Sequence, residues 1–165
     1  MIRTTALLLA ACLMLSLAAC KQAEEAAPQE TVKAPLTAPA EPADREGWNA
    51  YLSDVVQRNM DGVNNTPYVY TLPPDSDPTF EGAFERQKEK AFADVQNRVL
   101  PGNMLAYGGP ASAKIADMMV NAFTGVQPDS MKGVKVLFIG NVADDARVRP
   151  VVTPSGATYV FVEAK

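Results

Sequence analysis

The sequence has no histidine, and its 165 residues include only two cysteines, Cys12 and Cys20. Without histidine, Ser-His-Asp and Cys-His catalysis is excluded, and so are the usual zinc and copper sites built on His and Cys. We therefore predict no metal site and no cofactor. The formal net charge of −4 leaves no basic excess, so nucleic acid is not an expected partner. Carboxylates, hydroxyl groups, Lys and Arg remain as the groups that could do chemistry.

The N-terminal residues form a mostly apolar run that is too short to cross a bilayer. Arg3 supplies a positive charge, residues 6–17 are apolar apart from Ser16, and small residues precede Cys20. A charged start, a short apolar core and small residues before a cleavage point are typical of a secretory signal. A membrane-spanning helix would need about 20 apolar residues. We therefore interpret residues 1–19 as a signal peptide.

The four residues Leu-Ala-Ala-Cys that end at Cys20 resemble the lipobox of bacterial lipoproteins. This resemblance implies cleavage before Cys20 and acylation of that cysteine, which would anchor the mature chain to a membrane. It also implies, through Lys21 in place of an aspartate, the periplasmic face of the outer membrane rather than the inner membrane. The alternative is an ordinary secretory signal with a chance cysteine. With Cys12 removed and Cys20 acylated, the mature chain could not form an internal disulfide.

Residues 20–45 have the composition of a lipid anchor followed by a flexible spacer, and residues 46–165 that of one globular domain. In the first segment, prolines interrupt a mixture of Ala, Glu, Gln and Lys. Such a segment buries too little apolar surface to offset the entropy lost on ordering. The second segment has an ordinary single-domain size.

The hydrophobic pattern of residues 46–165 predicts helices that alternate with strands. This order favours a small layered α/β domain with a mainly parallel sheet and flanking helices. The alternative is an α+β fold, in which residues 143–156 form a loop and the last two strands pair antiparallel. Pro150 and Pro154 keep that alternative open, since Pro150 would leave any helix there short or broken. The expected helices span residues 46–60, 78–99, 111–123 and 144–152, and the expected strands span 68–72, 104–107, 134–139 and 157–162.

A candidate ligand-binding turn contains Gly108, Gly109 and Ser112, between an expected strand and an expected helix. Main-chain N–H groups at a helix N-terminus bind anions, and ligands of open α/β sheets gather at the carboxyl ends of strands. The residues match neither the dinucleotide-binding nor the P-loop glycine pattern. The alternative, which we favour, is a tight turn that simply requires glycine.

A second candidate turn contains Asn141, followed by Asp144 and Asp145. Two acids after a strand could bind a hard cation or act in acid–base chemistry. Adjacent helical residues point in different directions, however, and acids are favoured at any helix N-terminus by the helix dipole. We therefore interpret these acids as helix-capping residues.

These observations favour a membrane-anchored, non-enzymatic protein-binding module. Its expected partner is an envelope or toxin protein, as for an immunity or inhibitor lipoprotein, or for an accessory of envelope assembly or secretion. The alternative is a small enzyme or anion-ligand binder that uses the turns at 108–112 and 140–145.

Overall fold

The computed structural model describes residues 34–97 and 99–165. The expected signal peptide, Cys20 and the first part of the expected spacer lie outside the described residues. None of the helices in the described part of the chain is long and apolar enough to cross a membrane. The elements in chain order are α1 (Arg45–Arg58), β1 (Tyr68–Thr71), α2 (Phe80–Gln96), β2 (Met104–Gly108), α3 (Ser112–Phe123), β3 (Lys135–Gly140), α4 (Val142–Val152), η1 (Thr153–Ser155) and β4 (Thr158–Glu163).

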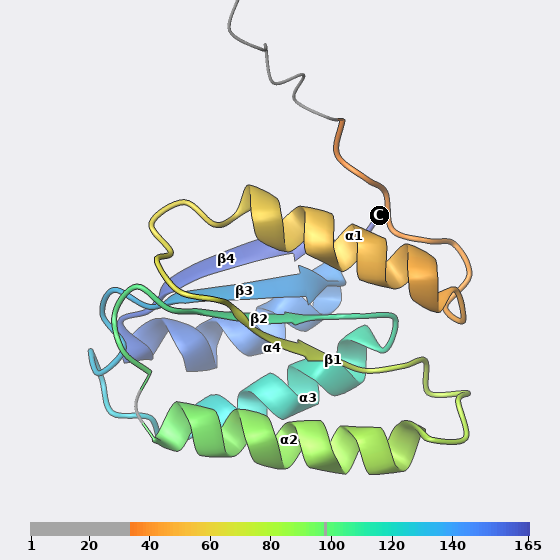
Figure 1. Ribbon diagram of the computed structural model, residues 1–165. Helices are drawn as coiled ribbons and strands as arrows, with labels where there is room; N and C mark the ends of the chain where they lie inside the picture. Colours follow the sequence, from red (N-terminus) through yellow and green to blue (C-terminus); the bar gives the residue numbers. More distant parts are fainter. Residues whose placement is uncertain (1–33, 98) are drawn as a thin grey trace, which may run out of the picture. The chain divides into compact units, whose positions relative to one another are not determined.

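The four strands form one parallel sheet in the order β1-β2-β3-β4. Helices α2, α3 and α4 each connect one strand to the next, and all three cover the same face (Figure 1). Helix α1 covers the opposite face. The expected α/β class is therefore confirmed. The α+β alternative is wrong because β3 and β4 are parallel, and a parallel pair needs a crossover connection such as α4.

A row of aromatic residues crosses the sheet, one from each strand. The register places Tyr70 beside Tyr107, Tyr107 beside Phe138, and Phe138 beside Phe161. The rings of Tyr70 and Tyr107 stack with centroids 4.6 Å apart, and those of Phe138 and Phe161 lie 5.7 Å apart. Since alternate residues of a strand face the same side, all four belong to the core beneath α2, α3 and α4.

The hydroxyl of Tyr70 ties this aromatic row to α2. It donates a hydrogen bond of 2.6 Å to the carboxylate of Asp94, which also forms an ion pair with Lys90. Burial, then the neighbouring Tyr107 and the bond to Asp94, raise the pKa of the Tyr70 phenol above its ordinary value. The phenol therefore stays protonated and keeps donating to α2.

A second, smaller core lies between α1 and the other face of the sheet. Trp48, Leu52 and Val55 recur at helical spacing and bury one face of α1. They pack against strand residues that include Met104 and Leu137. Both cores consist of residues from the compact unit formed by residues 34–165.

Residues just before α1 also belong to the packed unit. The main-chain N–H of Leu36 donates to the carboxylate of Asp54 at 3.1 Å, and that of Ala38 donates to the carbonyl of Lys165 at 3.0 Å. Leu36 and Ala38 pack against the core under α1. The packed unit therefore includes part of the segment that we assigned to the spacer. The sequence pattern did not indicate this, because the contacts join residues that are distant in the sequence.

Pro150 does not break the helix that contains it. Helix α4 runs without interruption from Val142 to Val152. The expectation of a short or broken helix was wrong because Pro150 lies in the last turn. There, only the carbonyl of Ala146 loses its helical hydrogen bond, and Ala146 is exposed, so water can replace the missing donor.

We predict that the aromatic row contributes a large part of the stability. Phe138 is fully buried, whereas Phe92 on α2 is 44% exposed. Phe138→Ala should lower the free energy of unfolding by about 3–5 kcal/mol, since it opens a cavity in the core. The matched variant Phe92→Ala should change it by less than about 1 kcal/mol. Urea denaturation followed by circular dichroism measures both, and equal losses would contradict the prediction.

Candidate functional site

The structure brings parts of the two expected turns together at the carboxyl edge of the sheet. Ser112 begins α3 after β2, and Asn141 precedes α4 after β3. Because β2 and β3 are parallel neighbours, their carboxyl ends adjoin, and so do the helix N-termini that follow them. Ser112, Asn141 and Asp144 are therefore in contact, although Ser112 and Asp144 are far apart in the sequence.

Hydrogen bonds inside this cluster use the polar groups that were candidates for ligand binding. The main-chain N–H of Asn141 donates to Oγ of Ser112 at 2.8 Å. The Ser112 hydroxyl in turn donates to Oδ2 of Asp144 at 2.7 Å. Both Ser112 and Asp144 are buried. This serine therefore connects α3 to α4, and its geometry supports a structural role rather than a nucleophilic one.

The two adjacent acids of α4 point in different directions, as expected for neighbouring helical residues. Asp145 accepts a hydrogen bond of 2.8 Å from the hydroxyl of Tyr159 and forms an ion pair with Arg149. Burial and then the bond to Asp145 raise the pKa of Tyr159 above its ordinary value. Asp145 thus fastens α4 to β4, whereas Asp144 is bound to Ser112.

The glycines of the turns allow close packing. A Cβ atom on Gly140 would lie 2.5 Å from both Oγ of Ser112 and the ring of Phe138. Gly109 has a φ of +150°, and a Cβ there would lie 2.9 Å from the carbonyl oxygen of Leu72. These distances support the tight-turn interpretation, since any side chain would displace its neighbours.

A small hollow of about 180 Å³ adjoins Ser112 and Asn141. Lys114 and Asp75 also line it, and because their charges are opposite, the hollow offers an anion no excess positive charge beyond the helix N-terminus itself. Among the described residues, no group of three or more His, Cys, Asp or Glu could hold a metal ion. The sheet order also has no reversal, and ligand crevices of open α/β sheets form where the order reverses.

Two larger cavities lie beside β1, at residues that the sequence analysis did not select. One is a groove of about 330 Å³ between α1 and β1, with Leu52, Val56 and Val69 among its walls. The other, of about 250 Å³, lies at the carboxyl end of β1 and is lined by Trp48 and several prolines. In the sequence, these prolines mark only the ends of elements, so no local pattern indicates that they line one cavity.

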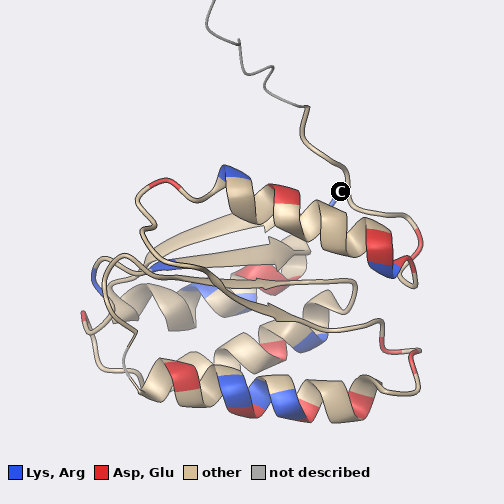
Figure 2. Cartoon of the chain, in the orientation of Figure 1, with Lys and Arg blue, Asp and Glu red and all other residues tan. Residues whose placement is uncertain are grey.

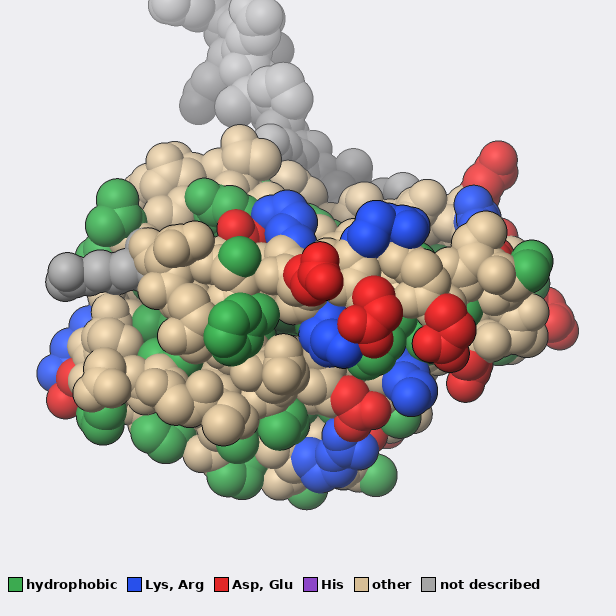
Figure 3. Space-filling view, turned by 90° about the horizontal axis from the view of Figure 1, so that it is seen from below, with side chains coloured by type: hydrophobic (Ala, Val, Ile, Leu, Met, Phe, Trp, Pro, Cys, Tyr) green, Lys and Arg blue, Asp and Glu red, His purple; other side chains and the backbone are tan. Residues whose placement is uncertain are grey.

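Charged side chains lie mainly on the helices (Figure 2). On the face that α2 covers, acidic and basic side chains are interspersed (Figure 3). Lys88 pairs with Glu85, and Lys90 with Asp94, so the two signs offset one another there. Strand β1, with the sequence Tyr-Val-Tyr-Thr, carries no charge.

No protein-family model, curated protein or solved structure matches the chain. Its function must therefore be inferred from the residues and their geometry.

We predict that Ser112 contributes to stability. Ser112→Ala would remove one hydrogen bond from the buried Asp144 carboxylate, which keeps its ion pair with Arg147, and the bond that the Asn141 N–H donates, at a cost of about 1–3 kcal/mol in the free energy of unfolding. Ser53→Ala, at an exposed position of α1, is the matched control and should cost less than about 0.5 kcal/mol. Chemical denaturation compares the two variants, and an unchanged midpoint for Ser112→Ala would refute the structural role.

Proposed function

We propose that this chain is a lipid-anchored protein of the periplasmic face of the bacterial outer membrane, and that it binds another protein without catalysing a reaction. The anchor is inferred from the Leu-Ala-Ala-Cys lipobox that ends at Cys20. The observation that supports protein binding is the open outer edge of β1, next to the apolar groove beneath α1.

The edge strand β1 has the properties of a surface for strand addition. Within residues 34–97 and 99–165, it pairs with β2 on one side only, and Tyr68 and Val69 are 42% and 49% exposed. Natural edge strands commonly carry a charge, a proline or a bulge that prevents such pairing. The four residues of β1 include neither charge nor proline, although Pro67 and Pro73 flank them. Its free main-chain groups can therefore bind an extended segment of another protein.

The groove beside β1 indicates which kind of segment would bind. Its apolar walls come from Leu52 and Val56 of α1, and from Pro67 and Val69. Side chains of an extended segment alternate between the two faces of the sheet. A partner segment with an apolar residue at every second position would therefore fill the groove while its main chain pairs with β1.

The proposed lipid anchor limits the kinds of protein that the domain can encounter. A domain tethered in the periplasm meets envelope proteins and incoming toxins, so we propose an immunity or inhibitor role, or an accessory role in envelope assembly or secretion. The alternative of an enzyme or anion binder at residues 108–112 and 140–145 is less well supported. There, the hydroxyl of Ser112 is bound within the fold, and the charges of Asp75 and Lys114 in the hollow are of opposite sign.

We predict that a photo-crosslinking amino acid at position 69 captures one defined envelope or toxin protein in cells. The same amino acid at Ala93, an exposed position of α2, should not capture it. With the purified partner, Val69→Asp should weaken binding at least about tenfold, since pairing would bury an unpaired charge. Val142→Asp is the matched control because Val142 is 57% exposed on α4, and it should leave binding unchanged. Equal effects of the two variants would refute the proposed surface.

We predict that Cys20→Ser abolishes the acylated mature N-terminus, because both the acylated residue and the cleavage that the lipobox implies depend on this cysteine. Cys12→Ser is the matched control: it changes the other cysteine, which is removed with the signal, and should leave the mature protein in the membrane. Cell fractionation and the mass of the mature N-terminus report the result. An unmodified chain whose mature N-terminus has the mass of an unacylated residue would overturn the lipid anchor.

A further inference from the structure

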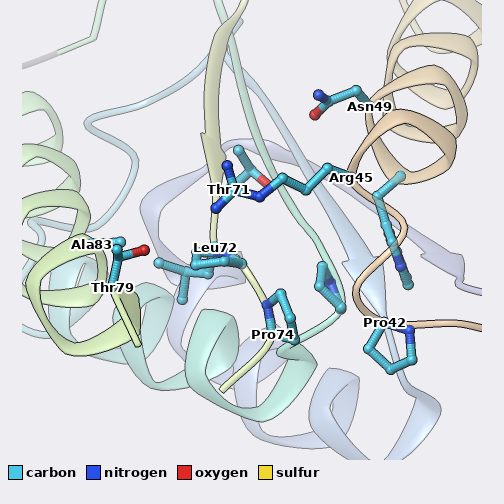
Figure 4. A pocket seen from close by; sticks show the side chains of 11 residues that line it. Pro42, Arg45, Asn49, Thr71, Leu72, Pro74, Thr79 and Ala83 are labelled. Carbon is cyan, nitrogen blue, oxygen red and sulfur yellow. The ribbon is translucent and has the colours of Figure 1, made fainter. Parts of the chain in front are cut away.

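A second cavity, at the carboxyl end of β1, adjoins the proposed protein-binding groove and shares Asn49 and Thr71 with it. It lies between the N-terminal turns of α1 and α2 and the segment that leaves β1 (Figure 4). Its volume of about 250 Å³ is below that of most sites for drug-sized ligands, so it has room for a single ring.

Rigid apolar groups form much of the cavity wall. Pro42, Pro73, Pro74 and Pro110 come from three separate segments and converge there with Trp48. Trp48 is buried and belongs to the core under α1. Its indole N–H has no hydrogen-bond acceptor among the described residues. The fold thus leaves one buried donor at this wall unsatisfied, which is uncommon in native proteins.

The charges at the mouth of the cavity neutralise one another. Arg45 extends from α1 across the cavity (Figure 4), and its guanidinium pairs with the carboxylate of Asp77 at 3.0 Å. Asp77 also accepts hydrogen bonds from the hydroxyl and the main-chain N–H of Thr79. These bonds from Thr79, and then the one from Arg45, hold the pKa of Asp77 below its usual range. At neutral pH the pair therefore has no net charge.

Two uncharged polar groups complete the lining. The side-chain amide of Asn49 and the hydroxyl of Thr71 form no hydrogen bond to another described residue. An amide and a hydroxyl each offer both donor and acceptor atoms. The cavity thus combines flat apolar walls, a neutral ion pair, and polar groups that are free to bind a ligand.

We infer that this cavity binds one uncharged, hydroxyl-rich ring of the kind that a saccharide presents. Each hydroxyl donates and accepts, which matches the mixed donors and acceptors of Asn49 and Thr71 and the N–H donors of Arg45. The C–H faces of the ring would pack against the prolines. The guanidinium of Arg45 would repel a cation, and its ion pair with Asp77 offsets its attraction for an anion, so the lining favours a neutral ligand.

Trp48 can serve as an intrinsic fluorescence probe of the cavity, because it is the only tryptophan in the sequence. The experiment titrates the full chain, in a detergent without a sugar headgroup, with glucose and with N-acetylglucosamine. We expect a saturable change in tryptophan emission with at least one of them. Glucosamine and glucose 6-phosphate are the charged comparators, and both should bind more weakly than the neutral sugar.

Variants of the lining test whether the emission change arises in this cavity. Asn49→Ala and Thr71→Val each remove one polar group and should weaken sugar binding about fivefold. Asn121→Ala on α3 is the matched control, since Asn121 is exposed and does not line the cavity, and it should bind as the unmodified chain does. Isothermal titration calorimetry supplies a second measurement that does not depend on the fluorescence of Trp48.

Three outcomes would overturn the inference: no saturable response to either neutral sugar, tighter binding of a charged comparator, or equal affinity of Asn49→Ala and Asn121→Ala. The result is separable from the protein-binding proposal. Val69→Asp should leave sugar binding unchanged because Val69 does not line this cavity.

Discussion

The aromatic row formed by Tyr70, Tyr107, Phe138 and Phe161 determines how the layers of this domain are arranged. Four large rings at one level of a parallel sheet create an apolar surface that must be covered by more than one helix. The three crossover helices α2, α3 and α4 cover it together, and they can do so because the strands follow one another in order across the sheet. The opposite face, with smaller side chains such as Ala106, is covered by one helix, α1, together with residues such as Leu36 and Ala38 that precede it.

This arrangement of the helices explains why the turns after β2 and β3 are filled by internal contacts, whereas cavities remain beside β1. At the carboxyl edge of the central strands, Ser112 and Asp144 join two crossover helices, so the turns there are occupied by internal hydrogen bonds. A single helix on the other face covers the sheet less completely. The groove and the cavity both lie where α1 passes β1, the edge strand that has a neighbour on one side only.

Sequence patterns predicted the elements well where burial was regular along the chain. The apolar run at 134–139 was expected to be a buried strand, and β3 spans Lys135–Gly140. The pattern was misleading at Pro150, which was expected to shorten or break its helix. Pro150 lies in the last turn of α4, and the helix accommodates a proline at that position. The pattern also could not detect that Leu36 and Ala38 pack against the core, since their partners Asp54 and Lys165 are distant in the sequence.

For the candidate site, the sequence by itself determined the available chemistry: without histidine, the polar groups are carboxylates, amides, hydroxyls, Lys and Arg. It also identified Ser112 and Asn141 as residues that follow the carboxyl ends of two expected strands, and the structure shows that these strands are neighbours. Only the tertiary structure decided that Ser112 is bound to Asp144, and that Arg45, Trp48 and four prolines surround a cavity. The physical reason is that helix and strand patterns record which side of an element is buried, whereas a hydrogen bond or a cavity wall depends on which distant segment lies against it.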